Sequence, residues 1–166
     1  MRKQDQKKHN DELIRKIIKK HGGDILESRK FCRSKNFIQH GKQSVFQHSI
    51  DVAKMSINIS RHLPFQFKER EIVRGALLHD YFLYDWHKRK SRVRKPSDIK
   101  KLHGFTHAHR AMRNADRDFG LSEGEKEIIK KHMWPLTYCP PTNREAWIVT
   151  MADKICSMRE TVNRRK

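Results

Sequence analysis

Cysteine is scarce in this sequence: only Cys32, Cys139 and Cys156 occur among 166 residues. Because they are odd in number, far apart and without Cys-x-x-Cys spacing, they argue against a disulfide framework and fit reduced thiols in a cytoplasm. The sequence also lacks an apolar signal region and any apolar run long enough to span a membrane. We therefore expect a soluble, cytoplasmic protein with no membrane contact.

Acidic residues are scarce as well: 19 Asp and Glu stand against 38 Lys and Arg, which gives a formal net charge of +19. A surface of this kind attracts polyanions, among them nucleic acids, nucleotides and polyphosphates. The charge does not choose between these partners, and it carries no information about chemistry. The apolar fraction of 36% is low, but the apolar residues recur periodically, which favours a small core under a solvated surface over disorder.

No segment alternates apolar and polar residues as strands do, and there is no internal repeat or low-complexity tract. Apolar residues recur instead at the spacings of three and four that predict helices, so we expect an all-α fold of one domain. Helices are predicted over residues 11–20, 24–30, 44–62, 67–80, 106–119, 122–134 and 143–162. The pair Gly22-Gly23 is expected to break the first helix. Capping boxes at Ser122 with Glu125 and at Thr142 with Glu145 are expected to start the last two.

An apolar helical run near the middle of the chain ends in His79 and Asp80, side by side. Both groups prefer water, so burying them is costly unless a cation holds them. A divalent metal would satisfy the pair at once, through an imidazole nitrogen and a carboxylate oxygen. The pair therefore marks a candidate metal site, provided that the rest of the chain supplies further ligands.

Residues of the same kinds stand on the apolar faces or at the ends of four other predicted helices: His48, His107, His132 and Asp153. Asp153 interrupts the apolar run of the last helix, where an unpaired buried carboxylate costs several kcal/mol. Nitrogen and oxygen ligands from five helices suit one or two ions of Mn, Fe, Mg or Zn. None is a thiolate, which argues against a Cys-rich structural zinc site. His103 and His109 flank His107, so the choice of His107 is open at this point.

The order of these residues resembles the signature of the HD-domain metal-dependent phosphohydrolases, which is H…HD…D, with two further histidines before the final aspartate in an extended form. The residues that carry the resemblance are His48, His79-Asp80, His107, His132 and Asp153. The resemblance implies a single HD-domain helical bundle over residues 44–158, with the metal site in its centre. A basic N-terminal helical extension (residues 1–43) would precede the domain, and a basic C-terminal tail (residues 159–166) would follow it.

The resemblance also implies a role for each ligand. A first metal would be bound by His48, His79, Asp80 and Asp153, and a second by His107 and His132, with Asp80 as a catalytic bridge between the two ions. A water molecule activated by the metals would attack phosphorus opposite the leaving oxygen. The protein would then be a hydrolase of phosphoesters or phosphoanhydrides, acting on a phosphate-containing small molecule of the nucleotide type.

Four further residues are candidates for proton transfer or substrate contact. Asp85 is either a loop residue or a catalytic residue that orients a ligand or acts as acid or base. Lys88 and Arg89 begin a basic run that is either a solvated loop or a collar for an anionic substrate. Lys154 stands where the family often has a basic residue after the metal aspartate, and is a candidate phosphate contact. Leu83 stands where many family members have a lysine, so that contact is missing here.

Two other functions fit parts of the sequence. Some HD-type proteins resemble di-iron oxygenases, which would use the same ligands to activate oxygen; obligate iron and oxygen consumption would identify this function. A non-enzymatic basic nucleic-acid-binding module would bind polyanions with a steep salt dependence and ignore chelators, but it would leave Asp153 unexplained. Non-specific nucleic-acid binding through the basic surface is compatible with each function. The sequence leaves the substrate, the metal and the oligomeric state open.

Overall fold

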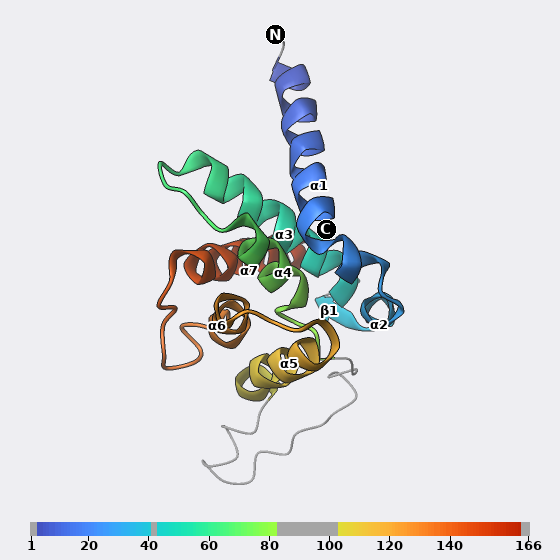
Figure 1. Ribbon diagram of the computed structural model, residues 1–166, viewed down its shortest axis with the longest axis vertical. Coiled ribbons are helices and arrows are strands. Elements are labelled where there is room, and N and C mark those ends of the chain that lie inside the picture. Colours follow the sequence, from blue (N-terminus) through green and yellow to red (C-terminus); the bar gives the residue numbers. More distant parts are fainter. Residues whose placement is uncertain (1–2, 41–42, 83–102, 164–166) are drawn as a thin grey trace.

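The computed structural model describes residues 3–40, 43–82 and 103–163. Helices account for most of them (Figure 1), so the predicted all-α class is confirmed. The helices are α1 (Lys3–Glu27), α2 (Arg29–Cys32), α3 (Val45–His62), α4 (Glu69–Leu78), α5 (His103–Phe119), α6 (Glu123–Lys131) and α7 (Arg144–Asn163), with a 3-10 turn, η1 (Arg33–Asn36), after α2. Within the described ranges the only strands are β1 (Ile38–His40) and β2 (Gln43–Ser44), a short antiparallel pair that the sequence did not predict.

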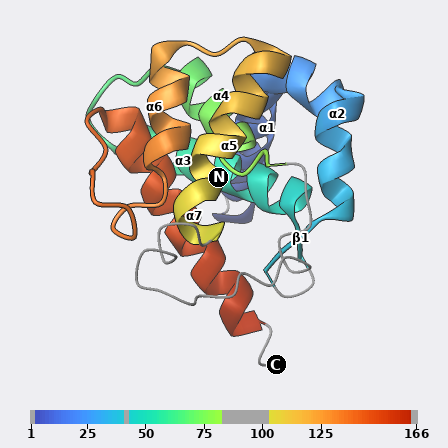
Figure 2. The same cartoon turned by 90° about the horizontal axis from the view of Figure 1, so that it is seen from below.

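The helix α4 lies at the centre of the bundle, with α1, α3, α6 and α7 packed against it (Figure 1). Every residue from Ile72 to Leu78 is buried. Burial of each large aliphatic side chain stabilises the fold by about 1.5–3 kcal/mol relative to exposure. On another side of the molecule α5 and α6 lie next to each other (Figure 2). The residues that follow α4, from His79 to Phe82, are buried as well.

The helix α1 is uninterrupted, so the predicted break at Gly22-Gly23 is wrong. Gly22 instead permits a close approach, because a Cβ atom there would lie 2.5 Å from Cδ1 of Leu77 in α4. Gly75 has the same role on α4, where a Cβ atom would lie 2.6 Å from Cγ2 of Ile128 in α6. These glycines serve contacts between helices, which the sequence of a single helix does not reveal.

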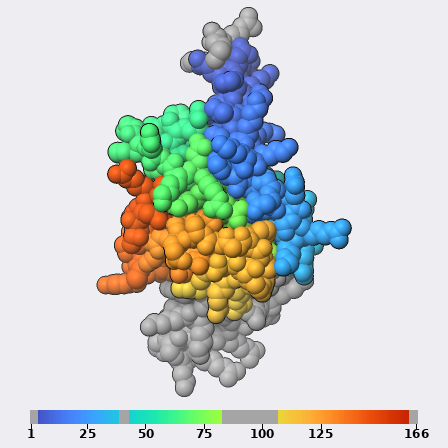
Figure 3. Space-filling view, viewed as in Figure 1, coloured from blue at the N-terminus to red at the C-terminus, as the bar shows by residue number. Residues whose placement is uncertain are grey.

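Although α1 lies in the segment predicted as an extension, it belongs to the core. Ile14, Ile17, Ile18 and Ile25 are buried in the same apolar cluster as side chains of α3, α4 and α7. The N-terminal turns of α1 project beyond the body of the protein (Figure 3). The domain limits at residues 43 and 158 stay predictions.

None of the described helices combines the length and the hydropathy that crossing a membrane requires.

The capping box of α6 is confirmed. The hydroxyl oxygen of Ser122 accepts the N–H of Glu125, and the carboxylate of Glu125 accepts the N–H of Ser122. The preceding helix, α5, begins at His103, three residues before the predicted start. It ends before Gly120, whose φ of 57° favours glycine. The helix predicted over 24–30 is divided between the end of α1 and α2.

The capping box predicted at Thr142 with Glu145 is wrong. The helix α7 is capped one residue later, by Asn143, whose Oδ1 accepts the N–H of Ala146 at 2.7 Å. The side chain of Glu145 is directed toward α4 instead, where its Oε1 accepts the backbone N–H of Lys68 at 3.1 Å. The start of α7 thus helps to cap α4, because the N–H of an N-cap residue such as Lys68 has no partner within its own helix.

Substitution of the two adjacent glycines of α1 should have opposite effects. Gly23→Ala meets no atom within 4 Å, so the gain in helix propensity should stabilise the protein by up to about 1 kcal/mol. Gly22→Ala makes the same gain but forces its Cβ against Leu77 in a packed core, at a cost of about 1–3 kcal/mol. Urea denaturation followed by circular dichroism measures both. Equal stability of the two variants would contradict the close approach of α1 and α4.

Candidate metal centre

The residues proposed as metal ligands from the sequence lie together in the interior, and each is at most 5% exposed. They form the histidine–aspartate cluster: His48 from α3, His79 and Asp80 from the end of α4, His107 from α5, His132 from the end of α6 and Asp153 from α7. These side chains come from five different helices. The cluster therefore depends on the packing of the whole bundle rather than on one local motif.

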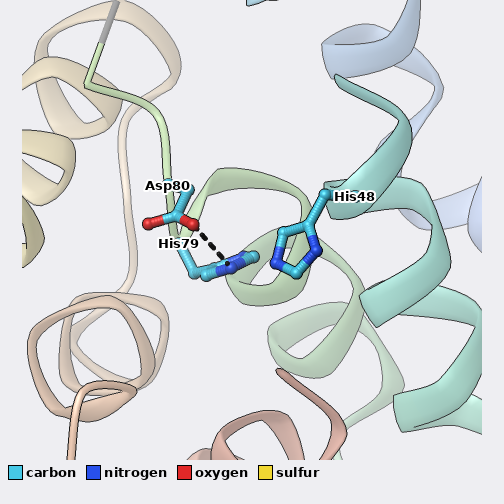
Figure 4. Close-up of side chains that lie close together, drawn as sticks. All are labelled: His48, His79 and Asp80. Atoms are coloured by element: carbon cyan, nitrogen blue, oxygen red, sulfur yellow. Dashed lines mark ion pairs between the residues drawn. The ribbon is translucent and has the colours of Figure 1, made fainter. Parts of the chain in front are cut away.

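His79 is the C-cap residue of α4, and its ring is held by that helix. Its Nδ1 lies 2.8 Å from the carbonyl oxygen of Ala76. Because a carbonyl only accepts, Nδ1 carries a proton. The opposite nitrogen, Nε2, faces Oδ2 of Asp80 at 3.2 Å, while the ring of His48 lies on the other side (Figure 4). When the His79 ring is neutral, Nε2 is therefore the nitrogen that can bind a metal.

His132 repeats this arrangement at the end of α6. It is the C-cap residue of that helix, and its Nδ1 lies 2.8 Å from the carbonyl oxygen of Ile129. The last four carbonyls of a helix have no partner within the helix, so the ring satisfies one of them. Burial lowers the pKa of His132, which keeps the ring neutral. Its Nε2 thus offers a lone pair to the cluster.

Asp80, His107 and His132 form one side of the cluster. The Nε2 atoms of the two histidines lie 3.1 Å apart. Oδ1 of Asp80 lies 3.3 Å from Nε2 of His107 and 3.5 Å from Nε2 of His132. Two imidazole nitrogens and a carboxylate oxygen thus converge on one small volume, which is the geometry of a metal-binding group.

His48 and Asp153 form the other side. Nε2 of His48 lies 3.1 Å from Oδ1 of Asp153, and Nδ1 lies 2.7 Å from Oε1 of Glu160. The same Oδ1 of Asp153 is 3.7 Å from Nε2 of His79. Asp153 therefore joins two histidines from different helices, as the cost of burying it predicted.

Without a bound cation, protons supply the positive charge of the cluster. Burial lowers the pKa of His48, but hydrogen bonds to Asp153 and Glu160 outweigh burial and raise that pKa to about 9. Burial also lowers the pKa of His79, yet the negative charges of Asp80 and Asp153 beside the ring raise it to about 10. Burial raises the pKa of Asp80 and Asp153, but the facing histidines hold both pKa values well below their usual range. Two imidazolium rings thus neutralise two carboxylates.

The donor set fits a divalent cation. Three groups of ligand atoms lie within 4.8 Å of one another: His48, His79 and Asp80; His79, His132 and Asp153; and Asp80, His107 and His132. The buried Nε2 of His79 has no hydrogen-bond partner of acceptable geometry among the described residues. A cation held between Nε2 and the carboxylates would satisfy it, and it would replace the charge that the protons supply.

The segment that carries Asp80 is anchored by α5. The side-chain amide of Asn114 donates to the carbonyl oxygens of Tyr81 and Phe82, both at 3.3 Å. One turn later on α5, Asp118 accepts the hydroxyl of Tyr81 at 3.1 Å. These contacts fix the chain directly after Asp80, so that its carboxylate keeps its place as the backbone leaves the helix.

The remaining candidates are placed as follows. Lys154 lies beside the cluster, with Nζ at 2.9 Å from Oδ2 of Asp153 and 3.1 Å from the carbonyl oxygen of His132. His109 is exposed, whereas His107 reaches the cluster; the side chain of His103 is outside the described part. The positions of Asp85, Lys88 and Arg89 also lie outside the described residues.

Sequence reasoning missed Glu160, which contacts His48 from α7. The residue falls in the segment predicted as a basic tail, although the helix predicted over 143–162 includes it, as α7 does. The available signal was its spacing from Asp153: seven residues, about two turns, place both on one helix face. The carbonyl contacts of His79 and His132 were missed too, because backbone acceptors leave no mark in the sequence.

The sequence of this chain matches the model of a known protein family. The family model described as HD domain matches residues 45–158, more than half of the chain. The matched range contains the whole histidine–aspartate cluster, from His48 to Asp153, and ends before Glu160. No curated protein and no solved structure matches the chain.

Metal binding should release protons and strengthen with rising pH. The pKa values of about 9 for His48 and about 10 for His79 mean that both rings are charged between pH 6 and 8. A metal must displace these protons, so its affinity should rise by up to about tenfold per pH unit for each displaced proton. Titration calorimetry with Mn²⁺ in buffers of different ionisation enthalpy counts the protons. We expect between one and two, and no proton release would refute this charge assignment.

Proposed function

We propose that this chain, which belongs to the HD-domain family of metal-dependent phosphohydrolases, hydrolyses a phosphoester or phosphoanhydride bond of a nucleotide-like substrate. The observation that carries the proposal is the buried histidine–aspartate cluster, whose ligand atoms fall into three overlapping groups. Nitrogen and oxygen ligands without a thiolate suit Mn, Fe, Mg or Zn. The interior position of the cluster also limits access of bulk water, which strengthens electrostatic interactions with a bound phosphate.

The overlap of the groups favours two adjacent metal positions. Asp80 belongs both to the group of His48 and to the group of His107 and His132. We assign the first position to His48, His79, Asp80 and Asp153, and the second to Asp80, His107 and His132. Bound divalent ions would supply charge neutralisation at the phosphoryl oxygens and a water molecule of lowered pKa.

The chain's own residues orient the ligands and attract the substrate. The carbonyls of Ala76 and Ile129 turn Nε2 of their histidines into the cluster. Lys154 holds an ammonium group at the edge of the cluster, with its side chain 40% exposed, where a phosphoryl oxygen can be contacted. The net charge of +19 draws anionic substrates toward the protein.

Other parts of the proposal rest on the sequence alone. The roles of Asp85 in acid–base chemistry and of Lys88 and Arg89 in substrate binding stay predictions, as does a cytoplasmic location.

Elemental analysis of the purified protein tests the two-ion assignment, and a screen over mononucleotides, dinucleoside polyphosphates, cyclic dinucleotides and alarmones tests the substrate class. Obligate iron with oxygen consumption and no phosphatase activity would favour the oxygenase alternative instead. Binding of nucleic acid that ignores chelators, without hydrolysis, would favour a non-enzymatic module.

Substitution of Asp80 should remove both metal retention and hydrolysis. The residue belongs to two of the three ligand groups, so Asp80→Ala should lower activity at least about 100-fold, more than the loss of an outer partner costs. Asp80→Asn, which keeps the shape of the side chain, should do the same. Metal content and phosphatase rate are measured together, with Asp5→Ala, an exposed aspartate of α1, as the charge control. Full activity of a folded Asp80 variant would make the assignment wrong.

Substitution of Lys154 should separate substrate binding from metal binding. Lys154→Met removes the ammonium group but none of the proposed metal ligands, so the metal content should be unchanged. The value of kcat/KM should fall by about 10-fold to 100-fold, since a charge-assisted hydrogen bond contributes about 1.5–3 kcal/mol. Inhibition by inorganic phosphate should weaken in parallel. Lys16→Met, at a side chain that is 71% exposed on α1, is the matched control. Unaltered phosphate inhibition in Lys154→Met would contradict the contact.

A further inference from the structure

His48 is oriented differently from the two histidines at helix ends. His79 and His132 each use a carbonyl of their own helix, three residues earlier in the chain. His48 instead lies in the first turn of α3, which Ser44 caps. The unpaired backbone groups of a first turn are N–H donors rather than carbonyl acceptors, so α3 offers its Nδ1 no acceptor. A partner for Nδ1 must come from another part of the chain.

Glu160 is that partner. Its Oε1 lies 2.7 Å from Nδ1 of His48, and its side chain is only 8% exposed. Asp153 lies about two turns earlier on the same face of α7, and its Oδ1 lies 3.1 Å from Nε2 of the same ring. One helix therefore holds both nitrogens of His48, each by its own carboxylate. When Nε2 binds a cation, the contact of Nδ1 with Glu160 remains available.

We propose that Glu160 is a positioning residue, which keeps Nδ1 of His48 protonated, turns Nε2 toward the metal, and so tightens binding at the metal position that His48 serves. The inference rests on the proposed function in so far as His48 is a metal ligand. A carboxylate that accepts from a ligand imidazole raises the basicity of the ring, and loss of such a partner costs about 10-fold to 100-fold in metal affinity. The position served by His107 and His132 does not depend on Glu160.

The first test measures Mn²⁺ affinity of the full-length chain by titration calorimetry. Glu160→Gln keeps the shape of the side chain but removes its charge, and it should weaken one binding event by about tenfold. That event is identified by its loss in His48→Ala. Glu160→Asp, which keeps the charge at a shorter reach, should recover part of the affinity. Glu123→Gln, at a side chain that is 88% exposed, removes the same charge and should change nothing.

The second test observes the ring itself by nitrogen–proton NMR of the Zn²⁺-loaded protein. The Nδ1–H signal of His48, assigned by its absence in His48→Ala, should shift in Glu160→Gln, while the signals of His79 and His132 stay in place. A purely structural role of Glu160 would move neither this signal nor the metal affinity selectively. Unchanged affinity or an unchanged Nδ1–H signal in Glu160→Gln would overturn the proposal. Neither test uses a phosphate substrate, so a failure of the proposed hydrolysis would be seen separately.

Discussion

The burial of two carboxylates, Asp80 and Asp153, is the constraint on which the centre of this protein depends. Each would cost several kcal/mol if it were buried without a partner. The partners are imidazoles from α3, α4, α5 and α6, and Asp153 itself comes from α7, so five helices must meet at one place. Packing and electrostatics are therefore one requirement here, because a displaced helix would leave a buried charge without its counterpart.

The direction of each helix decides how its histidine is held. Where a histidine closes a helix, as His79 and His132 do, the helix itself provides a carbonyl acceptor. Where a histidine opens a helix, as His48 does, the backbone nearby provides donors, and a carboxylate from α7 takes the place of the carbonyl. Helix polarity thus explains why one ligand needs a charged partner while two others do not.

Much of the fold and of the candidate site could be predicted from the sequence, because both leave a periodic pattern. The stripe around His48 and the apolar surroundings of Asp153 give the helices and their buried faces together. What could not be predicted depends on contacts between distant residues. Gly22 looks like a helix breaker until Leu77 lies against it. Glu160 lies in a segment rich in basic residues, and its contact with His48 forms only because α3 and α7 pack together.

The two close approaches at Gly22 and Gly75 also bear on how this scaffold could be modified. They fix α4 against α1 and α6 at distances that any larger side chain would disturb. By contrast, α5 is joined to the segment after α4 through the side chains of Asn114 and Asp118. Such side-chain contacts hold the segment after Asp80, but unlike a glycine contact they do not require two backbones to approach closely. A change to this scaffold that must keep the spacing of α1, α4 and α6 should therefore leave Gly22 and Gly75 intact.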